Sequence, residues 1–216
     1  MELYFSPLAC SMATRIAFYE AGAPARFVHV DTKAGRVEDG RDFAALNALG
    51  QVPVLRTDDG ELLTENAAIL QYVADHFPAA GLAPPAGMER SRLQQWLSFI
   101  GTELHKGVFV PLLDRRPNDG AKAFAREKAA ARLRCLDKHL DGREFLLDRF
   151  SVADAYLVTV LNWSLATGVV LGEFPALKAY YLRTLKRPSV ARAIVEERAM
   201  WLAGHPDVRL PDPASL

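Results

Sequence analysis

The sequence predicts an α/β domain over residues 1–80, followed by an all-helical domain over residues 88–203. Strand-length and helix-length apolar patterns alternate in the first region, whereas only helix-length patterns occur in the second. Residues 78–87 contain three prolines and two glycines, which is typical of a linker. Residues 204–216 carry three further prolines, and we expect an extended tail there.

The first region has the order of a βαβ unit, a short helix, a hairpin and a final helix. The Asp58-Asp59-Gly60 turn predicts the hairpin, and a βαβ unit requires a parallel pair of strands. We expect strands at residues 3–5, 27–30, 52–55 and 61–63, and helices at 10–21, 42–49 and 65–77.

The second region is expected to contain helices at residues 89–113, 121–140, 151–167, 174–185 and 189–201. The third is apolar on nearly all sides between Val152 and Val160, with Asp154 as its one charge, so we expect it to be buried. Ser151 and Asp154 have the spacing of a capping box, in which each side chain binds the backbone amide of the other residue.

Composition excludes some functions. The chain has 26 basic and 26 acidic residues and no basic run longer than Arg115-Arg116, so we expect no nucleic-acid or membrane-surface partner. It has no long uncharged apolar stretch, and its first residues do not resemble an export signal, so no membrane span and a cytoplasmic location are expected. Cys10 and Cys135 are then expected to be free thiols.

Cys10 follows a strand and a Ser-Pro turn and lies where the first helix is expected to begin. The unpaired amides at a helix N-terminus stabilise a thiolate, so the pKa of this thiol is expected to be lowered. The alternative is that Cys10 is a small buried hydrophobic residue. Pro7 and Ala13 exclude a C-x-x-C redox pair on either side of it.

Two further segments suit a peptide-like ligand. Pro53 follows a glycine-containing turn at the start of a strand, where a cis peptide would turn the backbone of Val52 outward, although a trans proline remains the alternative. Glu65 and Asn66 precede a helix, and helix amides with a carboxylate beside them would suit an amino-acid zwitterion. An ordinary capped helix is the other interpretation.

In the second region, Ser98, Thr102 and His105 have the spacing of one helical face, which could line a cleft or simply face solvent. His105 has no histidine or cysteine three or four residues away, so no metal site is expected.

Taken together, the motifs resemble the bacterial beta-class glutathione transferases over about residues 1–198. The resemblance rests on segments 3–11 (LYFSPLACS), 50–53 (GQVP), 58–60, 63–65, 69–72, 96–100, 102–106 and 150–157, and on Trp163. It implies a thioredoxin-like N-terminal domain, an all-α C-terminal domain, a homodimer, and glutathione as co-substrate with no metal.

The resemblance also implies roles for single residues. Val52, beside a cis Pro53, would pair with the cysteinyl unit of glutathione, Glu65 and Asn66 would hold its γ-glutamyl group, and Cys10 would face its sulfur. The second domain would contribute Ser98, Thr102, Leu104 and His105 near the sulfur, with His105 as a catalytic group beside Cys10. Glu103 is expected to approach the glutathione site of the other subunit.

The chain departs from the family pattern at several positions. Asn66 stands where glycine or serine is usual, and Ser98 where asparagine is common. Gly35 occupies the place of a lysine that meets the glycyl carboxylate, so Lys33 or Arg36 would have to replace it. The segment after Met200 is longer than expected.

Three functions are compatible with these residues. The leading hypothesis is conjugation, in which the thiolate of bound glutathione attacks a small hydrophobic electrophile held beside Phe109 and Trp163. The second is thiol–disulfide exchange through a mixed disulfide of Cys10 with glutathione. The third is a non-catalytic ligand-binding protein on the same fold.

Overall fold

The computed structural model describes residues 1–215 of the chain, which divides into two compact units. The first unit comprises residues 1–83 and 188–210, and the second comprises residues 84–187 and, among the described residues, 211–215. The segment 188–203 thus groups with the α/β unit, whereas the sequence analysis placed it in the helical domain. The physical reason is that this segment packs against the first helix of the chain, Met12–Glu20.

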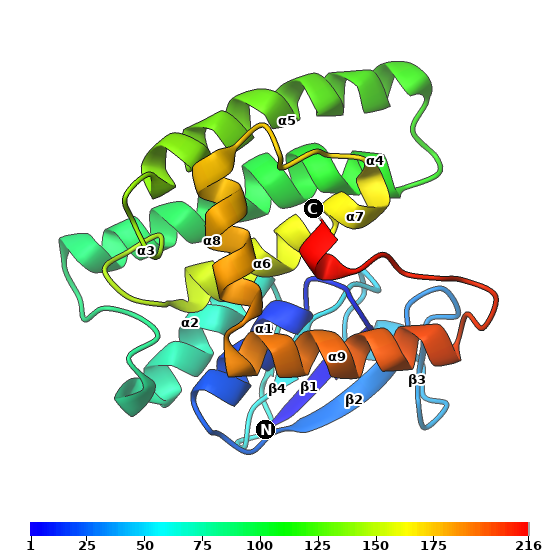
Figure 1. The fold of residues 1–216 in the computed structure, drawn as a ribbon. Coiled ribbons are helices and arrows are strands. Elements are labelled where there is room, and N and C mark those ends of the chain that lie inside the picture. Colours follow the sequence, from blue (N-terminus) through cyan, green and yellow to red (C-terminus); the bar gives the residue numbers. More distant parts are fainter. Residues whose placement is uncertain (216) are drawn as a thin grey trace. The chain divides into compact units, whose positions relative to one another are not determined.

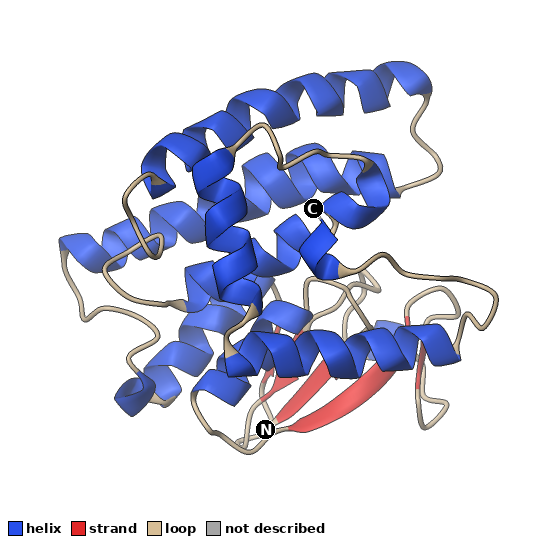
Figure 2. Cartoon of the chain, in the orientation of Figure 1, coloured by secondary structure: helices blue, strands red, loops and turns tan. Residues whose placement is uncertain are grey.

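The first unit contains a five-stranded sheet, drawn in red in Figure 2, with the strand order β3-β2-β1-β4-β5. The first two strands are parallel and the last two antiparallel, which confirms the predicted βαβ unit and hairpin. The edge strand β3 has two residues and was too short to predict. The strands are β1 (Glu2–Phe5), β2 (Arg26–Asp31), β3 (Arg36–Val37), β4 (Val54–Arg56) and β5 (Leu62–Leu63).

The helices of this unit are α1 (Met12–Glu20), α2 (Asn66–His76) and α9 (Pro188–Ala203), with short 3-10 turns η1 (Phe43–Ala45) and η2 (Pro78–Ala80). Helix α1 packs against both α2 and α9 (Figure 1). The prediction of a helix over residues 42–49 is wrong, because only η1 forms there. Beyond η1, the Asn47 side chain binds the amide of Leu49 and the carbonyl of Gln51, and so turns the chain instead of extending the helix.

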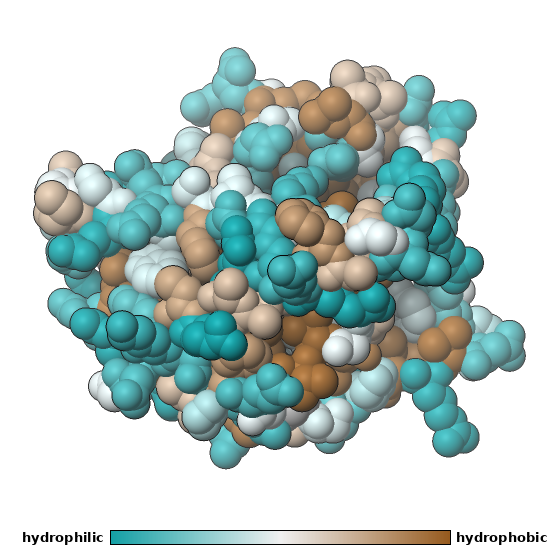
Figure 3. All heavy atoms as spheres, turned by 90° about the horizontal axis from the view of Figure 1, so that it is seen from above, coloured by the Kyte–Doolittle hydropathy of each residue, from teal (hydrophilic) through white to brown (hydrophobic). Residues whose placement is uncertain are grey.

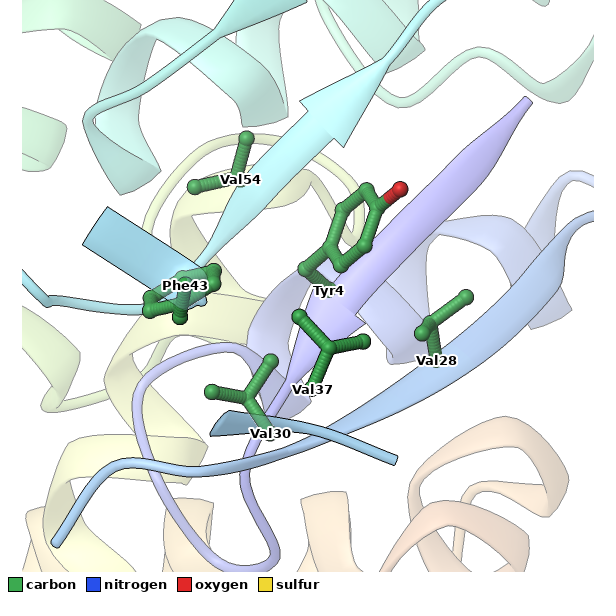
Figure 4. Packing of buried hydrophobic residues seen from close by; sticks show 6 residues of the cluster. All are labelled: Tyr4, Val28, Val30, Val37, Phe43 and Val54. Atoms are coloured by element: carbon green, nitrogen blue, oxygen red, sulfur yellow. The ribbon is translucent and has the colours of Figure 1, made fainter. Parts of the chain in front are cut away.

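A compact apolar cluster lies on the sheet and its flanking turn (Figure 4). Val28 and Val30 of β2 point to the same face because successive side chains of a strand alternate between faces. Tyr4, Val37, Phe43 and Val54 complete the cluster, and all six side chains are buried.

Helix α9 fixes the loop that leads from β1 to Cys10. The backbone N–H of Leu8, which has a φ of 61°, donates to Oε2 of the buried Glu197 at 2.7 Å. The Nη1 atom of Arg15 lies 3.6 Å from Oε1 of Glu197. The Arg15 guanidinium also lies 4.3 Å from the ring centroids of Phe5 and Phe27, which suits a cation–π contact.

The second unit is helical, but two of its predicted helices are subdivided. The segment predicted as one helix over residues 89–113 consists of α3, a π-helical stretch η3 and α4, and the segment 151–167 consists of α6 and α7. The elements are α3 (Met88–Phe99), η3 (Ile100–Phe109), α4 (Val110–Leu113), α5 (Asp119–Leu140), α6 (Val152–Asn162), α7 (Ser164–Thr167), α8 (Pro175–Leu185) and a 3-10 turn η4 (Pro213–Ser215).

Helix α6 is buried along its whole length, and its capping box is present, as predicted. The carboxylate of Asp154 accepts hydrogen bonds from the amides of Ser151 and Leu146 at 2.9 and 3.0 Å. It also accepts from the hydroxyls of Ser151 and Tyr180 at 2.9 and 3.0 Å. Asp154 therefore joins the start of α6 to α8 and to the chain before α6.

On the face drawn in Figure 3, hydrophilic residues predominate and hydrophobic residues occur in small groups among them. Within residues 1–215, no helix combines the length and the apolar character that a membrane span requires.

We predict that Asp154→Ala destabilises the protein by about 3–5 kcal/mol, because it leaves two buried amides and two hydroxyls without their acceptor. The midpoint of urea unfolding, followed by circular dichroism, measures the effect. Asp141→Ala, at an exposed position after α5, is the control and is expected to change stability by less than about 0.5 kcal/mol. Equal midpoints for the two variants would contradict the structural role of Asp154.

We predict that Glu197 makes the stability of the protein fall between about pH 5 and pH 8. Burial raises the pKa of Glu197 to about 8, more than the nearby charge of Arg15 lowers it. Above the ordinary glutamate pKa of about 4.3, the native state therefore keeps a proton that the unfolded chain has lost. Unfolding then releases this proton, so the unfolding free energy decreases as the pH rises toward the native pKa.

In the Glu197→Gln variant this part of the pH dependence is expected to disappear. Urea midpoints of both proteins at several pH values from 5 to 8.5 measure it, and the exposed Glu127→Gln variant serves as the control. Parallel profiles for wild type and Glu197→Gln would show that Glu197 does not titrate in this range.

Candidate functional site

Cys10 lies in the loop just before α1 and is 9% exposed. Its thiol donates a hydrogen bond to the carbonyl oxygen of Val52, with 3.3 Å between Sγ and O. The loop is closed by Ser11, whose hydroxyl donates to the carbonyl of Ser6 at 3.3 Å. A thiolate has no proton to donate, so this geometry belongs to the protonated form of Cys10.

Val52 and Pro53 are joined by a cis peptide bond, which confirms the cis geometry that the family resemblance implied. Val52 is partly buried against the apolar cluster of the sheet, and its carbonyl contacts Cys10. The backbone predicted to meet a peptide-like ligand therefore lies beside the thiol predicted to meet its sulfur.

The start of α2 is the second feature of this unit. Glu65 is exposed and has a φ of 66°. Within residues 1–215, Leu8 and Glu65 are the two non-glycine residues with positive φ. Such backbone conformations concentrate at ligand and active sites. Glu65 is itself predicted to bind the ligand, and Leu8 lies two residues before Cys10.

Asn66, the first residue of α2, is 6% exposed. Its Oδ1 accepts a hydrogen bond from the hydroxyl of Thr14 in α1 at 3.1 Å. Its Nδ2 has no hydrogen-bond partner among the described residues. An unpaired buried donor at a helix N-terminus is suited to a carboxylate ligand, because the helix amides there are also unpaired.

Of the candidate partners of a glycyl carboxylate, Lys33 lies on the turn between β2 and β3, and Arg36 is the first residue of β3. Lys33 and Arg36 are exposed, and Gly35 between them has a φ of 66°. The carboxylate of Asp31 accepts from the amides of Lys33 and Ala34 at 2.9 Å, which fixes the turn. One cationic side chain thus lies on a short, ordered turn, and the other lies directly after it at the start of β3.

In the second unit, His105 lies within the π-helical stretch and is 8% exposed. Its Nδ1 lies 2.6 Å from the hydroxyl oxygen of Tyr156, and its ring meets that of Trp163 with a centroid distance of 4.9 Å. Burial, with a smaller contribution from the charge of Lys106, lowers the pKa of His105 to about 4. His105 is therefore neutral near pH 7.

The structure does not place His105 with Ser98 and Thr102 as one α-helical face. The α-helical spacing ends at Phe99, and the wider π-helical turns follow. Ser98 and Thr102 are exposed, whereas His105 is buried, and the Thr102 hydroxyl donates to the carbonyl of Ser98 at 3.0 Å. Leu104 is fully buried.

Glu103 is bound by two cations within its own unit. Its Oε2 accepts from Nε and Nη2 of Arg132 at 2.9 and 2.7 Å, and Nζ of Lys128 lies 3.3 Å away. The hydrogen bond from Arg132, followed by that from Lys128, lowers the pKa of Glu103. Lys128 also lies against Gly107, where a Cβ atom would come within 2.8 Å of Nζ.

The two residues predicted to hold the electrophile, Phe109 and Trp163, are neighbouring aromatic side chains. The rings of Phe109 and Trp163 are 6.0 Å apart in an edge-to-face arrangement, and Trp163 also contacts His105. Within residues 1–215, no group of three histidine, cysteine or acidic side chains is arranged to hold a metal ion.

Thr14, Tyr156 and Glu197 were not predicted from the sequence, and they support Asn66, His105 and the loop before Cys10, respectively. A helical pattern cannot identify them, because each is a buried residue whose partner is distant in the sequence. Arg15, a charged residue in the buried part of α1, was the one available signal for Glu197.

Comparison with known proteins agrees with this geometry. The model of the glutathione S-transferase N-terminal domain matches residues 1–75, and that of the C-terminal domain matches residues 102–188. Glutathione S-transferase GstA of Escherichia coli O157:H7 is 39% identical over 199 residues, which is 91% of this chain and 98% of the relative.

Two solved structures are similar throughout. A sphingomonad glutathione S-transferase complexed with glutathione has 46% identity and a TM-score of 0.87, covering 92% of this chain and 99% of its own. A beta-class glutathione S-transferase of Sphingomonas chungbukensis also has 46% identity and a TM-score of 0.87, covering 91% and 98%. The chain therefore belongs to the glutathione S-transferase family, within which it is similar to the bacterial beta class.

Proposed function

We propose that this chain is a glutathione S-transferase enzyme that conjugates glutathione to small electrophiles. The observation that carries this proposal is the contact between the Cys10 thiol and the Val52 carbonyl. If Val52 pairs with the cysteinyl unit of glutathione, the glutathione sulfur comes to lie beside Cys10. Membership of the family and the glutathione complexes of its relatives support this assignment.

The first unit offers a complementary group for each part of glutathione. Val52 and Pro53 would hold the cysteinyl unit through the backbone. The Glu65 carboxylate would pair with the ammonium group of the γ-glutamyl unit, and Nδ2 of Asn66 would donate to its carboxylate. Lys33 or Arg36, on either side of Gly35, would meet the glycyl carboxylate.

In this reaction the glutathione thiolate attacks the electrophilic carbon, a carbon–sulfur bond forms, and the leaving group departs with its electron pair. The protein lowers the barrier by stabilising the thiolate and orienting it. The S–H group of Cys10 is the candidate donor, because the Met12 and Ala13 amides at the start of α1 already donate to the carbonyls of Ala9 and Cys10. His105, which the family resemblance assigns to the same sulfur, is neutral near pH 7 and would act through an N–H group.

A second candidate function is thiol–disulfide exchange, favoured by the presence of a cysteine at this position. The Cys10 thiolate would attack a glutathione mixed disulfide, releasing the substrate thiol and forming a Cys10–glutathione disulfide. A free glutathione thiolate would then attack this disulfide, release oxidised glutathione and restore Cys10, so the reaction consumes one free glutathione for each mixed disulfide reduced.

The remaining assignments belong to the same proposal. A small hydrophobic electrophile would bind beside Phe109 and Trp163, with Ser98, Thr102 and Leu104 contributing to the site in the second domain. Glu103 would approach the glutathione of a second subunit in a homodimer. Residues 78–87 would link the α/β domain at 1–80 to the helical region that begins at residue 88, with 204–216 as a tail. Two free thiols suit a reducing, cytoplasmic location.

We predict that Cys10→Ala retains conjugating activity, within about tenfold of wild type, because glutathione supplies the nucleophile. The same variant is expected to lose all measurable reduction of a glutathione mixed disulfide, because the attacking thiol is gone. The initial rates with glutathione and a chloronitroaromatic electrophile, and with a mixed disulfide, measure both effects. Cys135→Ala, an exposed position on α5, is the control and is expected to match wild type.

Three outcomes would contradict these assignments. Wild type that binds glutathione in calorimetry but conjugates no electrophile would remove the leading proposal. Mixed-disulfide reduction by Cys10→Ala at the wild-type rate would remove the second. If millimolar glutathione does not bind at all, both fail and a non-catalytic ligand-binding protein becomes the better account.

A further inference from the structure

The side-chain amide of Asn66 is buried and held at one end only. Its Oδ1 accepts from the Thr14 hydroxyl at 3.1 Å, while Nδ2 has no partner within residues 1–215. Leaving a buried amide donor unpaired is costly, and such groups in native proteins are nearly always satisfied by protein, water or ligand. We therefore expect Nδ2 of Asn66 to donate a hydrogen bond to an acceptor from outside the chain.

The position of the free donor indicates the charge of that acceptor. Asn66 is the first residue of α2, an eleven-residue helix, where unpaired backbone amides favour an anion. Nδ2 is a donor only, so it suits a carboxylate, and it would oppose an ammonium group. The Glu65 side chain, one residue earlier and exposed, has the opposite preference.

The two ends of an asparagine amide have nearly the same shape but opposite hydrogen-bonding roles. If the amide of Asn66 were rotated by half a turn, the lone pairs of Oδ1 would face the ligand carboxylate and repel it. A fixed donor at the protein side of the amide prevents this rotation. The only hydrogen bond described for the Asn66 side chain within residues 1–215 comes from Thr14.

Thr14 is well suited to this task. It lies in α1 and is fully buried. Its β-branched side chain has few rotamers in a helix, so the position of the hydroxyl is restricted. The same helix begins just after Cys10, so one rigid element reaches both the thiol and the Asn66 amide.

We propose that Thr14 is a positioning residue for glutathione: its hydroxyl donates to Oδ1 of Asn66 and so presents Nδ2 to the γ-glutamyl α-carboxylate. This inference rests on the proposed function, since it names the part of glutathione that the start of α2 recognises. It makes a buried residue without ligand contact a determinant of specificity for the α-carboxylate.

The test uses Thr14→Val, which removes the hydroxyl and keeps the shape of the side chain. Calorimetric titration compares glutathione with γ-aminobutyryl-cysteinylglycine, the analogue that lacks only the α-carboxylate and keeps the amino group. We expect Thr14→Val to bind glutathione about 5- to 20-fold more weakly than wild type and to bind the analogue with unchanged affinity.

Two further variants separate this role from a general effect on folding. Thr14→Ser keeps the hydroxyl and is expected to bind glutathione within about twofold of wild type. Thr159→Val removes another buried threonine hydroxyl, which bonds the Ala155 carbonyl in α6, and is expected to leave both affinities unchanged. Urea midpoints establish that each variant is folded under the conditions of titration.

The proposal is overturned if Thr14→Val binds glutathione as wild type does, or if it loses affinity equally for glutathione and the analogue. It is also overturned if Thr14→Ser loses as much affinity as Thr14→Val. A wild-type protein that binds neither ligand would instead remove the proposed function itself, and with it the basis of this inference.

Discussion

The burial of helix α1 on all sides is the constraint on which the candidate site of the first unit depends. Every side chain from Met12 to Phe18 is buried, and the helix packs against both α2 and α9. Its start fixes the loop that carries Cys10, Thr14 reaches Asn66 in α2, and Arg15 lies beside Glu197 in α9. Since α1 has no exposed face on which to shift, the thiol, the amide and the loop are held in one arrangement.

The buried pair of Arg15 in α1 and Glu197 in α9 illustrates how this arrangement is held. Both side chains are almost fully buried, and burial, which disfavours the charged form, raises the pKa of Glu197 to about 8. Burying such ionisable groups is costly unless their contacts are good. The Arg15 guanidinium contacts the aromatic rings of two phenylalanines, Phe5 and Phe27. The Glu197 carboxyl accepts a hydrogen bond from the backbone N–H of Leu8. Glu197 thus stabilises a backbone conformation, at Leu8, that a non-glycine residue rarely adopts. The pair serves the geometry of the loop as well as the packing of α9.

Sequence patterns predicted the parts of the molecule that are determined locally. The βαβ order, the hairpin at Asp58-Asp59-Gly60 and the capping box at Ser151 follow from short-range spacing, and all three are present. The π-helical stretch around His105 and the grouping of α9 with the first unit depend on tertiary packing, which no local pattern records.

The candidate site divides in the same way. Cys10, Val52 and Asn66 stand at a strand end, a turn and a helix start, and the family resemblance predicted their roles toward glutathione. Their supporting residues were not predicted, since Thr14 and Glu197 act over 52 and 189 positions in the chain. The residues proposed to touch a ligand therefore carried a sequence signal, whereas those that orient them became visible only in the fold.

The protonation state of Cys10 links the geometry to the choice between the two reactions. Disulfide exchange requires the Cys10 thiolate, which must give up its hydrogen bond to the Val52 carbonyl. Conjugation requires only that glutathione lose its proton, and a protonated Cys10 can then donate to the glutathione sulfur. Because the observed hydrogen bond stabilises the S–H form, it favours conjugation over exchange.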